Sequence, residues 1–309
     1  MKFYTSVLPY RGRLLVRGVD KDGAQKKYRI NYKPSLFVPV GKETKYKTLD
    51  GRYVERIKFD SMPEATKWVN EYKNVTNFEY FGNTRHQYPF IADEFKGKID
   101  WDMNKIKLLT IDIECESENG FPSPEKADQP LICITVKDHT TKKIIVFGMG
   151  NFVNDREDVQ YINCVTETGL VETFTKFWVE YNPDIITGWN VKFFDIPYLM
   201  NRFRYLMGDE WLNQFSPWGV VEQKSASVLF ASREQQVWNI MGVDTLDYLD
   251  LYRKFTFVRR ESYKLDYIGE VELGQNKLDN PYDTFKEFYS NDYQRFVEYN
   301  IQDVELVDK

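Results

Sequence analysis

The hydrophobic pattern of this chain changes near residue 105, and that change constrains the fold more than any other feature. Before it, residues 3–9, 13–19 and 25–32 have the composition of short strands separated by turn residues. After it, apolar strand segments alternate with segments of helical period, which is typical of an α/β core. We therefore expect a smaller β-rich domain over residues 1–104 and an α/β domain over residues 105–309.

One helix is expected in the first domain. The sequence Ser61-Met-Pro-Glu64 has the pattern of a capping box with proline in the first turn. Apolar residues follow at helical spacing, at Ala65, Trp68, Val69 and Tyr72. Asp50-Gly51 is a hairpin signal, so the domain is predicted to be one amphipathic helix on a small antiparallel sheet. Its boundary is expected in the polar segment 95–104.

The second domain is expected to alternate strands with helices, which makes the chain α+β overall. Strands are predicted at residues 107–114, 131–138, 143–149, 184–187 and 243–249, with an extended hairpin at 227–230 and 236–240. Helices are predicted over residues 170–181 and 196–203, near 262–269, and from about residue 292.

The cysteines and the N-terminus indicate the compartment. Three cysteines, Cys115, Cys133 and Cys164, have neither the spacing of a zinc site nor the even number of a disulfide framework. The N-terminus has no apolar signal segment, and no apolar run is long enough to span a bilayer. We expect a cytosolic chain with no membrane partner.

The net charge of −5 is unevenly distributed. Residues 1–60 hold 15 Lys and Arg against 6 Asp and Glu, and the remaining residues hold 27 against 41. The balances of +9 and −14 leave a basic first domain, which favours contact with nucleic acid. A solvated basic surface on an ordinary β-domain explains the same charge, so both interpretations stay open here.

Acidic residues indicate which chemistry the chain can perform. Asp112 and Glu114 lie two apart on a predicted strand, so their side chains share a face. An edge strand with two solvated acids is the alternative, but the apolar neighbours favour a central strand. Acids on a central strand are costly unless a cation compensates their charge.

Three more residues extend this acidic set. Asp195 precedes a predicted helix with Pro197 in its first turn, so it is either a ligand or a helix N-cap. Tyr299 and Asp303 share one face of the last helix, either as site residues or as a surface pair. Carboxylates without Cys or His suit Mg²⁺ or Mn²⁺, which activate water against phosphodiesters. The chain is therefore interpreted as a nuclease.

These residues carry a family resemblance. Asp112-Ile-Glu114, Asn190-x-x-x-Phe194-Asp195 and Tyr299-x-x-x-Asp303 resemble, in order, the three exonuclease motifs of family B DNA polymerases. The likeness covers essentially the whole chain and is strongest to T-even-type phage replicative polymerases. A shorter segment between the first and second motifs is a departure. The resemblance implies a polymerase N-terminal domain followed by a ribonuclease-H-like 3′→5′ proofreading exonuclease domain with a mixed sheet.

The resemblance also implies the roles of the site residues. Asp112, Glu114, Asp195 and Asp303 would bind two Mg²⁺ or Mn²⁺ ions, with Asp112 bridging both. Hydrolysis at such a site uses two metals roughly 3.5–4 Å apart. Tyr299 would orient the attacking water, since a phenol with a pKa near ~10 is no strong base at neutral pH. A tyrosine rather than a histidine in the last motif indicates the tyrosine subclass.

Substrate contacts are expected beside the acids. Phe121 would pack against the terminal base, or is an ordinary loop anchor. Asn190 and Phe194 of the second motif would contact the terminal nucleotide. Arg259 and Arg260, with neighbouring basic residues, would contact the phosphates of the DNA strand. Alternatively, they are solvated residues at the start of a helix. The expected partner is a single-stranded DNA 3′ end or a primer–template.

The polymerase palm motifs of the family, D-x-x-S-L-Y-P and D-T-D, are missing from the sequence. No polymerase activity is expected from this chain alone, so palm, fingers and thumb would belong to the same full-length protein or to a separate chain. A phage-encoded chain would act in the cytoplasm of the infected host cell. Two alternatives remain, a non-catalytic module that binds template or messenger RNA, and an exonuclease that degrades RNA.

Overall fold

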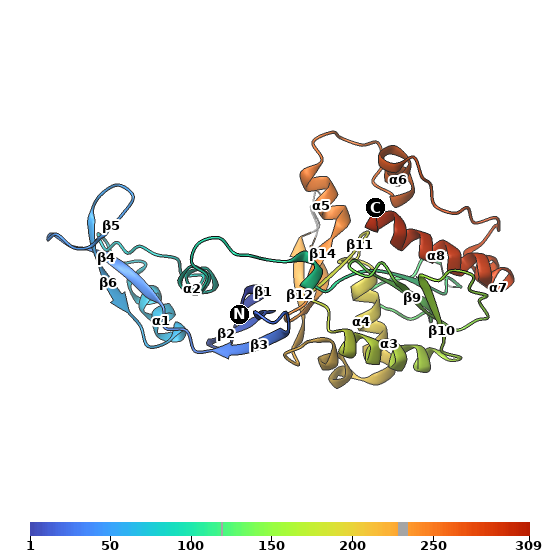
Figure 1. Cartoon of the computed structure of the whole chain (residues 1–309), viewed down its shortest axis with the longest axis horizontal. Coiled ribbons are helices and arrows are strands. Elements are labelled where there is room, and N and C mark those ends of the chain that lie inside the picture. Colours follow the sequence, from blue (N-terminus) through green and yellow to red (C-terminus); the bar gives the residue numbers. More distant parts are fainter. Residues whose placement is uncertain (119, 228–233) are drawn as a thin grey trace. The chain divides into compact units, whose positions relative to one another are not determined.

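The computed structural model describes residues 1–118, 120–227 and 234–309, and it contains two compact units, Met1–Lys105 and Ile106–Lys309 (Figure 1). Each unit has its own hydrophobic clusters. Among the helices of these described segments, none is both long and apolar enough to cross a bilayer.

The first unit contains two three-stranded antiparallel sheets rather than one. The first sheet has the order β1–β2–β3, formed by Phe3–Tyr10, Arg13–Val19 and Gln25–Ile30. The second has the order β4–β6–β5, formed by Ser35–Pro39, Tyr53–Lys58 and Tyr46–Lys47. The hairpin predicted at Asp50-Gly51 joins β5 to β6.

The expectation of a single helix in the first unit is wrong. The predicted helix is α1, Met62–Tyr72, and the Ser61 side chain accepts from the backbone N–H of Glu64 at 3.3 Å. A second helix, α2, spans Gln87–Glu94 and buries Phe90 in a cluster with Leu14 of β2. Its sequence begins after a histidine instead of a capping residue, so tertiary packing, more than local sequence, stabilises it.

The second unit is built on a six-stranded mixed sheet with the order β10–β9–β8–β7–β11–β14. These strands are Val159–Asn163, Ile144–Gly148, Leu131–Asp138, Leu108–Cys115, Ile185–Gly188 and Asp244–Asp247. β7 is antiparallel to β8 and parallel to β11, so the predicted central strand is confirmed. The carboxyl ends of β7 and β11 therefore lie at the same edge.

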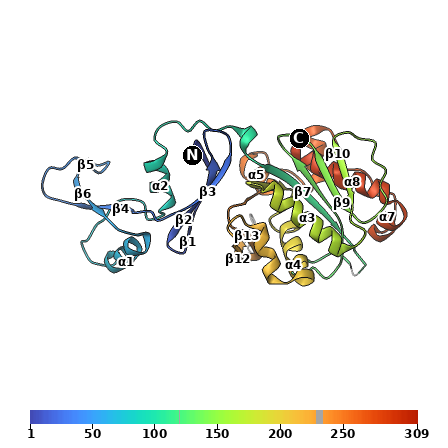
Figure 2. The same cartoon turned by 60° about the horizontal axis from the view of Figure 1, so that its bottom comes forward.

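Helices cover both faces of this sheet (Figure 2). On one face, α3 (Glu167–Tyr181) and α4 (Asp195–Met207) pack against Ile111 and Ile113 of β7. On the other, α7 (Phe285–Asn291) and α8 (Tyr293–Asp308) pack against apolar residues of β8 and β9. The predicted α/β core with a mixed sheet is thus confirmed.

At the opposite edge from the carboxyl end of β7, a tight turn joins β8 to β9. Asp138 ends β8 and pairs with Leu109 near the start of β7. Its side chain accepts from the backbone N–H groups of Thr140 at 2.7 Å and Thr141 at 3.0 Å. The aspartate therefore fixes the turn through its own side chain.

Several details of the second unit differ from expectation. The strand predicted over 243–249 ends at Asp247, and helix α5, Tyr248–Phe255, follows at once. Asp247 causes this change, because its side chain accepts from the backbone N–H groups of Leu249 and Asp250 and caps α5. Strand β10 and helix α7 were not predicted.

The hairpin and the next helix are partly as predicted. β12, Val221–Ser227, pairs antiparallel with β13, Glu234–Ile240, and residues 228–230 of the prediction lie outside the described residues. The helix expected near 262–269 is α6, Leu265–Leu273. Short 3₁₀ turns occupy Met103–Lys105 and Asp209–Phe215.

Candidate active site

A cavity of about 830 Å³ opens in the second unit, where β7 and β11 end. Its walls come from β7 and the loop after it, the segment that joins β11 to α4, the start of α6, the segment that leads into α7, and α8. The predicted site residues that line it are Asp112, Glu114, Phe121, Asn190, Phe194, Asp195, Tyr299 and Asp303. Segments almost 200 residues apart in the sequence therefore contribute to a single cavity.

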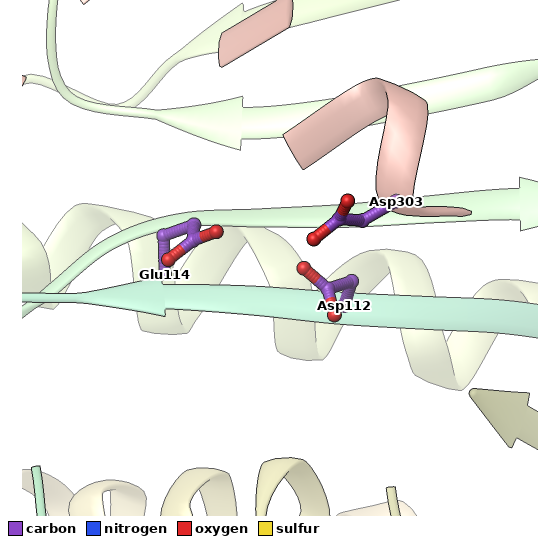
Figure 3. A group of neighbouring side chains, drawn as sticks. All are labelled: Asp112, Glu114 and Asp303. Atoms are coloured by element: carbon purple, nitrogen blue, oxygen red, sulfur yellow. The ribbon is translucent and has the colours of Figure 1, made fainter. Parts of the chain in front are cut away.

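Three carboxylates meet at this cavity. Asp112 and Glu114 project from the same face of β7, and Asp303 reaches toward them from α8 (Figure 3). One carboxylate oxygen of each lies within 4.8 Å of the others. Period-two alternation explains the arrangement, because Ile111 and Ile113 fill the apolar layer on the opposite face.

Asp195 is attached to β7 rather than to its own helix. Phe194 occupies the N-cap position of α4, and Asp195 is the first helical residue, 4% exposed. Its Oδ1 accepts from the backbone N–H of Ile113 at 3.2 Å, between the two acids of β7. The N-cap alternative for Asp195 is therefore wrong, because a strand amide takes the place of a helix amide.

A lysine that the sequence analysis missed lies among the acids. Lys277 Nζ forms an ion pair with Asp303 Oδ2 and lies 4.4 Å from the centroid of the Tyr299 ring. Asp303 Oδ1 is buried without a hydrogen-bond partner among the residues that the structure describes. One oxygen of this carboxylate is thus neutralised and the other is unsatisfied.

Aromatic rings form the outer part of the cavity. Phe121 is 86% exposed, and its ring centroid lies 5.5 Å from that of Phe194. Asn190 has a left-handed backbone, φ 65°, and its N–H donates to Asp247 Oδ1 at 3.2 Å. The same carboxylate accepts from the Lys192 N–H at 3.0 Å, so Asp247 fixes the loop that carries the second motif.

Comparison with known proteins identifies the family. A family model described as the exonuclease domain of DNA polymerase family B matches residues 64–268. The chain belongs to the family B DNA polymerases. Two phage polymerases confirm the predicted resemblance to the T-even-type enzymes.

The DNA-directed DNA polymerase of Escherichia phage RB69 is 31% identical to this family B chain over 98% of its length. That of Enterobacteria phage T4 is 29% identical over 99%. The DNA polymerase delta catalytic subunit of Candida albicans is 31% identical over 57% of this chain and 18% of its own length. The chain spans 36% of each phage polymerase. Its mixed sheet and helices form the ribonuclease-H-like fold of the exonuclease domain.

Burial shifts the acids of this family B chain toward their protonated forms. Burial, with repulsion from Asp195 and Asp303, raises the pKa of Asp112 well above its ordinary value. Burial raises the pKa of Glu114 to about 8 and that of Asp195 to about 7. It raises the pKa of Asp303 to about 6, against the opposing ammonium group of Lys277. The group therefore has too much negative charge for its surroundings and accepts positive charge readily.

The donor set suits a divalent cation. Carboxylate oxygens are the ligands that Mg²⁺ and Mn²⁺ prefer, and three are within reach of a single ion. The unsatisfied Oδ1 of Asp303 provides a buried acceptor with an unfilled position. The residues present therefore fit the metal that exonuclease domains of this kind use.

Asn300 is a second residue that the sequence analysis missed. It lies one position after Tyr299 on α8, and its Nδ2 donates to Asp112 Oδ2 at 2.5 Å. The motif pattern Tyr299-x-x-x-Asp303 specifies no residue type at this position. Asn300 lies three residues before Asp303, a spacing that places both side chains on one helix face, and this was the signal that could have identified it.

The two predicted arginines lie elsewhere. Among the described residues that line the cavity, Lys264 is present, whereas Arg259 and Arg260 are not. Arg260 forms an ion pair with Glu272 at 2.5 Å and donates to the Tyr252 hydroxyl at 3.0 Å. Its guanidinium group is therefore engaged in linking α5 to α6, and the predicted contact with phosphates remains a prediction.

Proposed function

We propose that the second unit is a 3′→5′ exodeoxyribonuclease that removes nucleotides from single-stranded 3′ ends and proofreads for a family B polymerase. The observation that carries the proposal is the group Asp112, Glu114 and Asp303, which shares one cavity with Asp195. A module that only binds nucleic acid has no need of two buried and two half-buried acids gathered at such electrostatic cost. The first unit is proposed to be the polymerase N-terminal domain.

Asp112, Glu114, Asp195 and Asp303 would hold the metal. Together they carry four negative charges when ionised, which balances two divalent ions. A bound Mg²⁺ or Mn²⁺ lowers the pKa of its water and stabilises negative charge on the phosphate and the leaving oxygen. The role of the protein is to fix the four carboxylates before substrate arrives, which it does from β7, α4 and α8.

Tyr299 acts as a hydrogen-bond donor. Burial raises its pKa to about 12, although the nearby ammonium group of Lys277 opposes that shift. The phenol therefore keeps its proton at neutral pH and orients a water or phosphate oxygen through O–H. Asp303, four residues later on the same helix face, lines the same cavity, and its Oδ1 has no hydrogen-bond partner among the residues described.

The outer cavity selects an unpaired end. Phe121 and Phe194 offer ring faces on which a base can stack once it has left its partner. The side chain of Asn190 lines the same space and can hydrogen-bond to the terminal nucleotide. A paired 3′ end must first be unstacked, so it reacts more slowly than a single strand.

A time course on 5′-labelled oligonucleotides tests this function. We expect stepwise shortening from the 3′ end with Mg²⁺ or Mn²⁺, none in EDTA, and slower shortening of a paired end. Asp112→Ala and Asp303→Ala should each lower the rate by at least about 100-fold, in line with the loss of a preorganised electrostatic group. Asp209→Ala, at an exposed acid outside the cavity, is the matched control. Activity that survives both site substitutions would refute the assignment.

A further inference from the structure

Asn300 is a buried amide in the third motif with no role in the function proposed above. It is 0% exposed and lies on α8 beside Tyr299. Its Nδ2 donates to Asp112 Oδ2 at 2.5 Å. A neutral donor thus contacts a carboxylate that the proposed function assigns to the metal.

The other end of the amide is held by a thiol. Asn300 Oδ1 accepts from Cys133 Sγ at 3.4 Å, and Cys133 lies on β8 directly opposite Glu114. An ionised carboxylate, the form that binds a metal, can only accept and the thiol can donate, so a single orientation of the amide satisfies both neighbours. Cys133 therefore sets the orientation of the amide, and the amide sets the rotation of the Asp112 carboxylate.

Asn300 and Lys277 hold their carboxylates in different ways. Lys277 brings a positive charge to Asp303. An incoming cation must therefore displace the ammonium group or share the carboxylate with it. The amide of Asn300 adds no charge and leaves Asp112 with its full attraction for a metal ion. In Figure 3, one Asp112 oxygen points toward the Asp303 carboxylate and the other points away. A hydrogen bond that fixes the rotation of Asp112 also fixes where its oxygens meet the cation.

We infer that Asn300 is a positioning residue that orients Asp112 for metal binding, with Cys133 orienting Asn300 in turn. The inference rests on the proposed function, because it assigns Asp112 to the metal. Partners that orient metal ligands typically contribute roughly 10- to 100-fold to metal affinity or activity. Loss of the Asn300 hydrogen bond should therefore weaken metal binding more than it weakens DNA binding.

Manganese binding to the DNA-free chain, followed by the electron paramagnetic resonance of free Mn²⁺, is the main test. Asn300→Leu keeps the volume and removes the donor, and we expect about tenfold weaker Mn²⁺ binding. The Mn²⁺ concentration for half-maximal exonuclease rate should rise in parallel, while KM for a single-stranded oligonucleotide stays within about twofold. Asn201→Leu is the matched control, since that buried amide on α4 donates to the Pro124 carbonyl, away from the acids.

Two substitutions of Cys133 test the inference even if Asn300→Leu impairs folding. Cys133→Ser retains a donor for Asn300 Oδ1 and should bind Mn²⁺ like the wild type, whereas Cys133→Ala should bind it several-fold more weakly. Equal Mn²⁺ affinity for Cys133→Ala and Cys133→Ser, or for Asn300→Leu and wild type, would overturn the inference. A wild-type chain without metal-dependent cleavage would instead refute the proposed function, so the two failures are distinguishable.

Discussion

The ammonium group of Lys277 lies 4.4 Å from the centroid of the Tyr299 ring, and the same group forms an ion pair with Asp303. The side chain of Lys277 is only 22% exposed, so the interaction takes place largely out of water. It brings a positive charge to a cluster of buried and half-buried carboxylates. Lys277 therefore stabilises the metal-free site against its own repulsion.

Lys277→Met should destabilise the chain more in EDTA than with a divalent ion. Removal of one partner of a buried ion pair leaves an uncompensated charge, and for this partly exposed lysine we expect a loss of about 2 kcal/mol in EDTA. Mn²⁺ should recover most of it, because a bound cation replaces the missing charge. Thermal unfolding with and without Mn²⁺ measures the difference. Lys286→Met, which breaks an exposed pair with Glu118, should leave the melting temperature unchanged.

The stability of the metal-free chain should fall as the pH rises from about 5 to 8. Burial raises the pKa of Asp303 to about 6, of Asp195 to about 7 and of Glu114 to about 8. Unfolded Asp and Glu titrate near ~4, so in this window the folded state binds more protons than the unfolded state. Stability then decreases with rising pH. Melting temperatures in EDTA across this range test the sign.

Glu114→Gln is the control for this pH dependence. The amide cannot ionise, so the variant should lose less stability between pH 5 and 8 than the wild type. A saturating divalent ion should flatten the profile of the wild type in the same way. A wild-type melting temperature that rises with pH over this range would contradict the assigned shifts.

Asp195→Asn should separate the catalytic role of this residue from its structural one. The amide oxygen of asparagine can still accept from the Ile113 N–H, so the strand–helix contact and the melting temperature should be preserved. The negative charge is lost, and the exonuclease rate should fall by at least about 100-fold. A large fall in melting temperature would show that the charge is needed for folding instead.

Phe121→Ala should raise KM for a single-stranded oligonucleotide more than it lowers kcat. The ring is largely exposed, so its loss removes little buried area. Stacking of a base on an aromatic side chain is worth about 1–3 kcal/mol, which corresponds to a KM higher by a factor of about 5 or more. Phe257→Ala is the matched control, because that ring is fully exposed and lies outside the described lining of the cavity. An equal effect of both substitutions would remove Phe121 from the substrate contacts.

Much of the inner site followed from the sequence, because strand and helix periods determine which side chains share a face. Asp112 and Glu114 lie on one side of β7, and Asp303 lies on the helix face that covers them. The position of Asp195 did not follow in the same way. Its local sequence favours a helix cap, and only the tertiary approach of Ile113 decides otherwise.

The site residues that could not be predicted from the sequence are those whose role depends on contacts with residues distant in the chain. Lys277 belongs to the irregular segment between α6 and α7, 26 positions before Asp303, where no period predicts the direction of a side chain. Helices α2 and α7 were missed for a related reason. Both are short, and the aromatic residues Phe90 and Phe288 that they bury find their partners in other elements.

The turn after β8 offers a site for attaching a label, because β8 runs antiparallel to β7. Because Asp138 pairs with Leu109, the turn through Thr140 and Thr141 emerges at the opposite edge of the sheet from the carboxylates. A fluorophore or a surface tether joined there leaves the mouth of the cavity open. Single-molecule recordings of nucleotide release could then follow this unit without a label near the DNA.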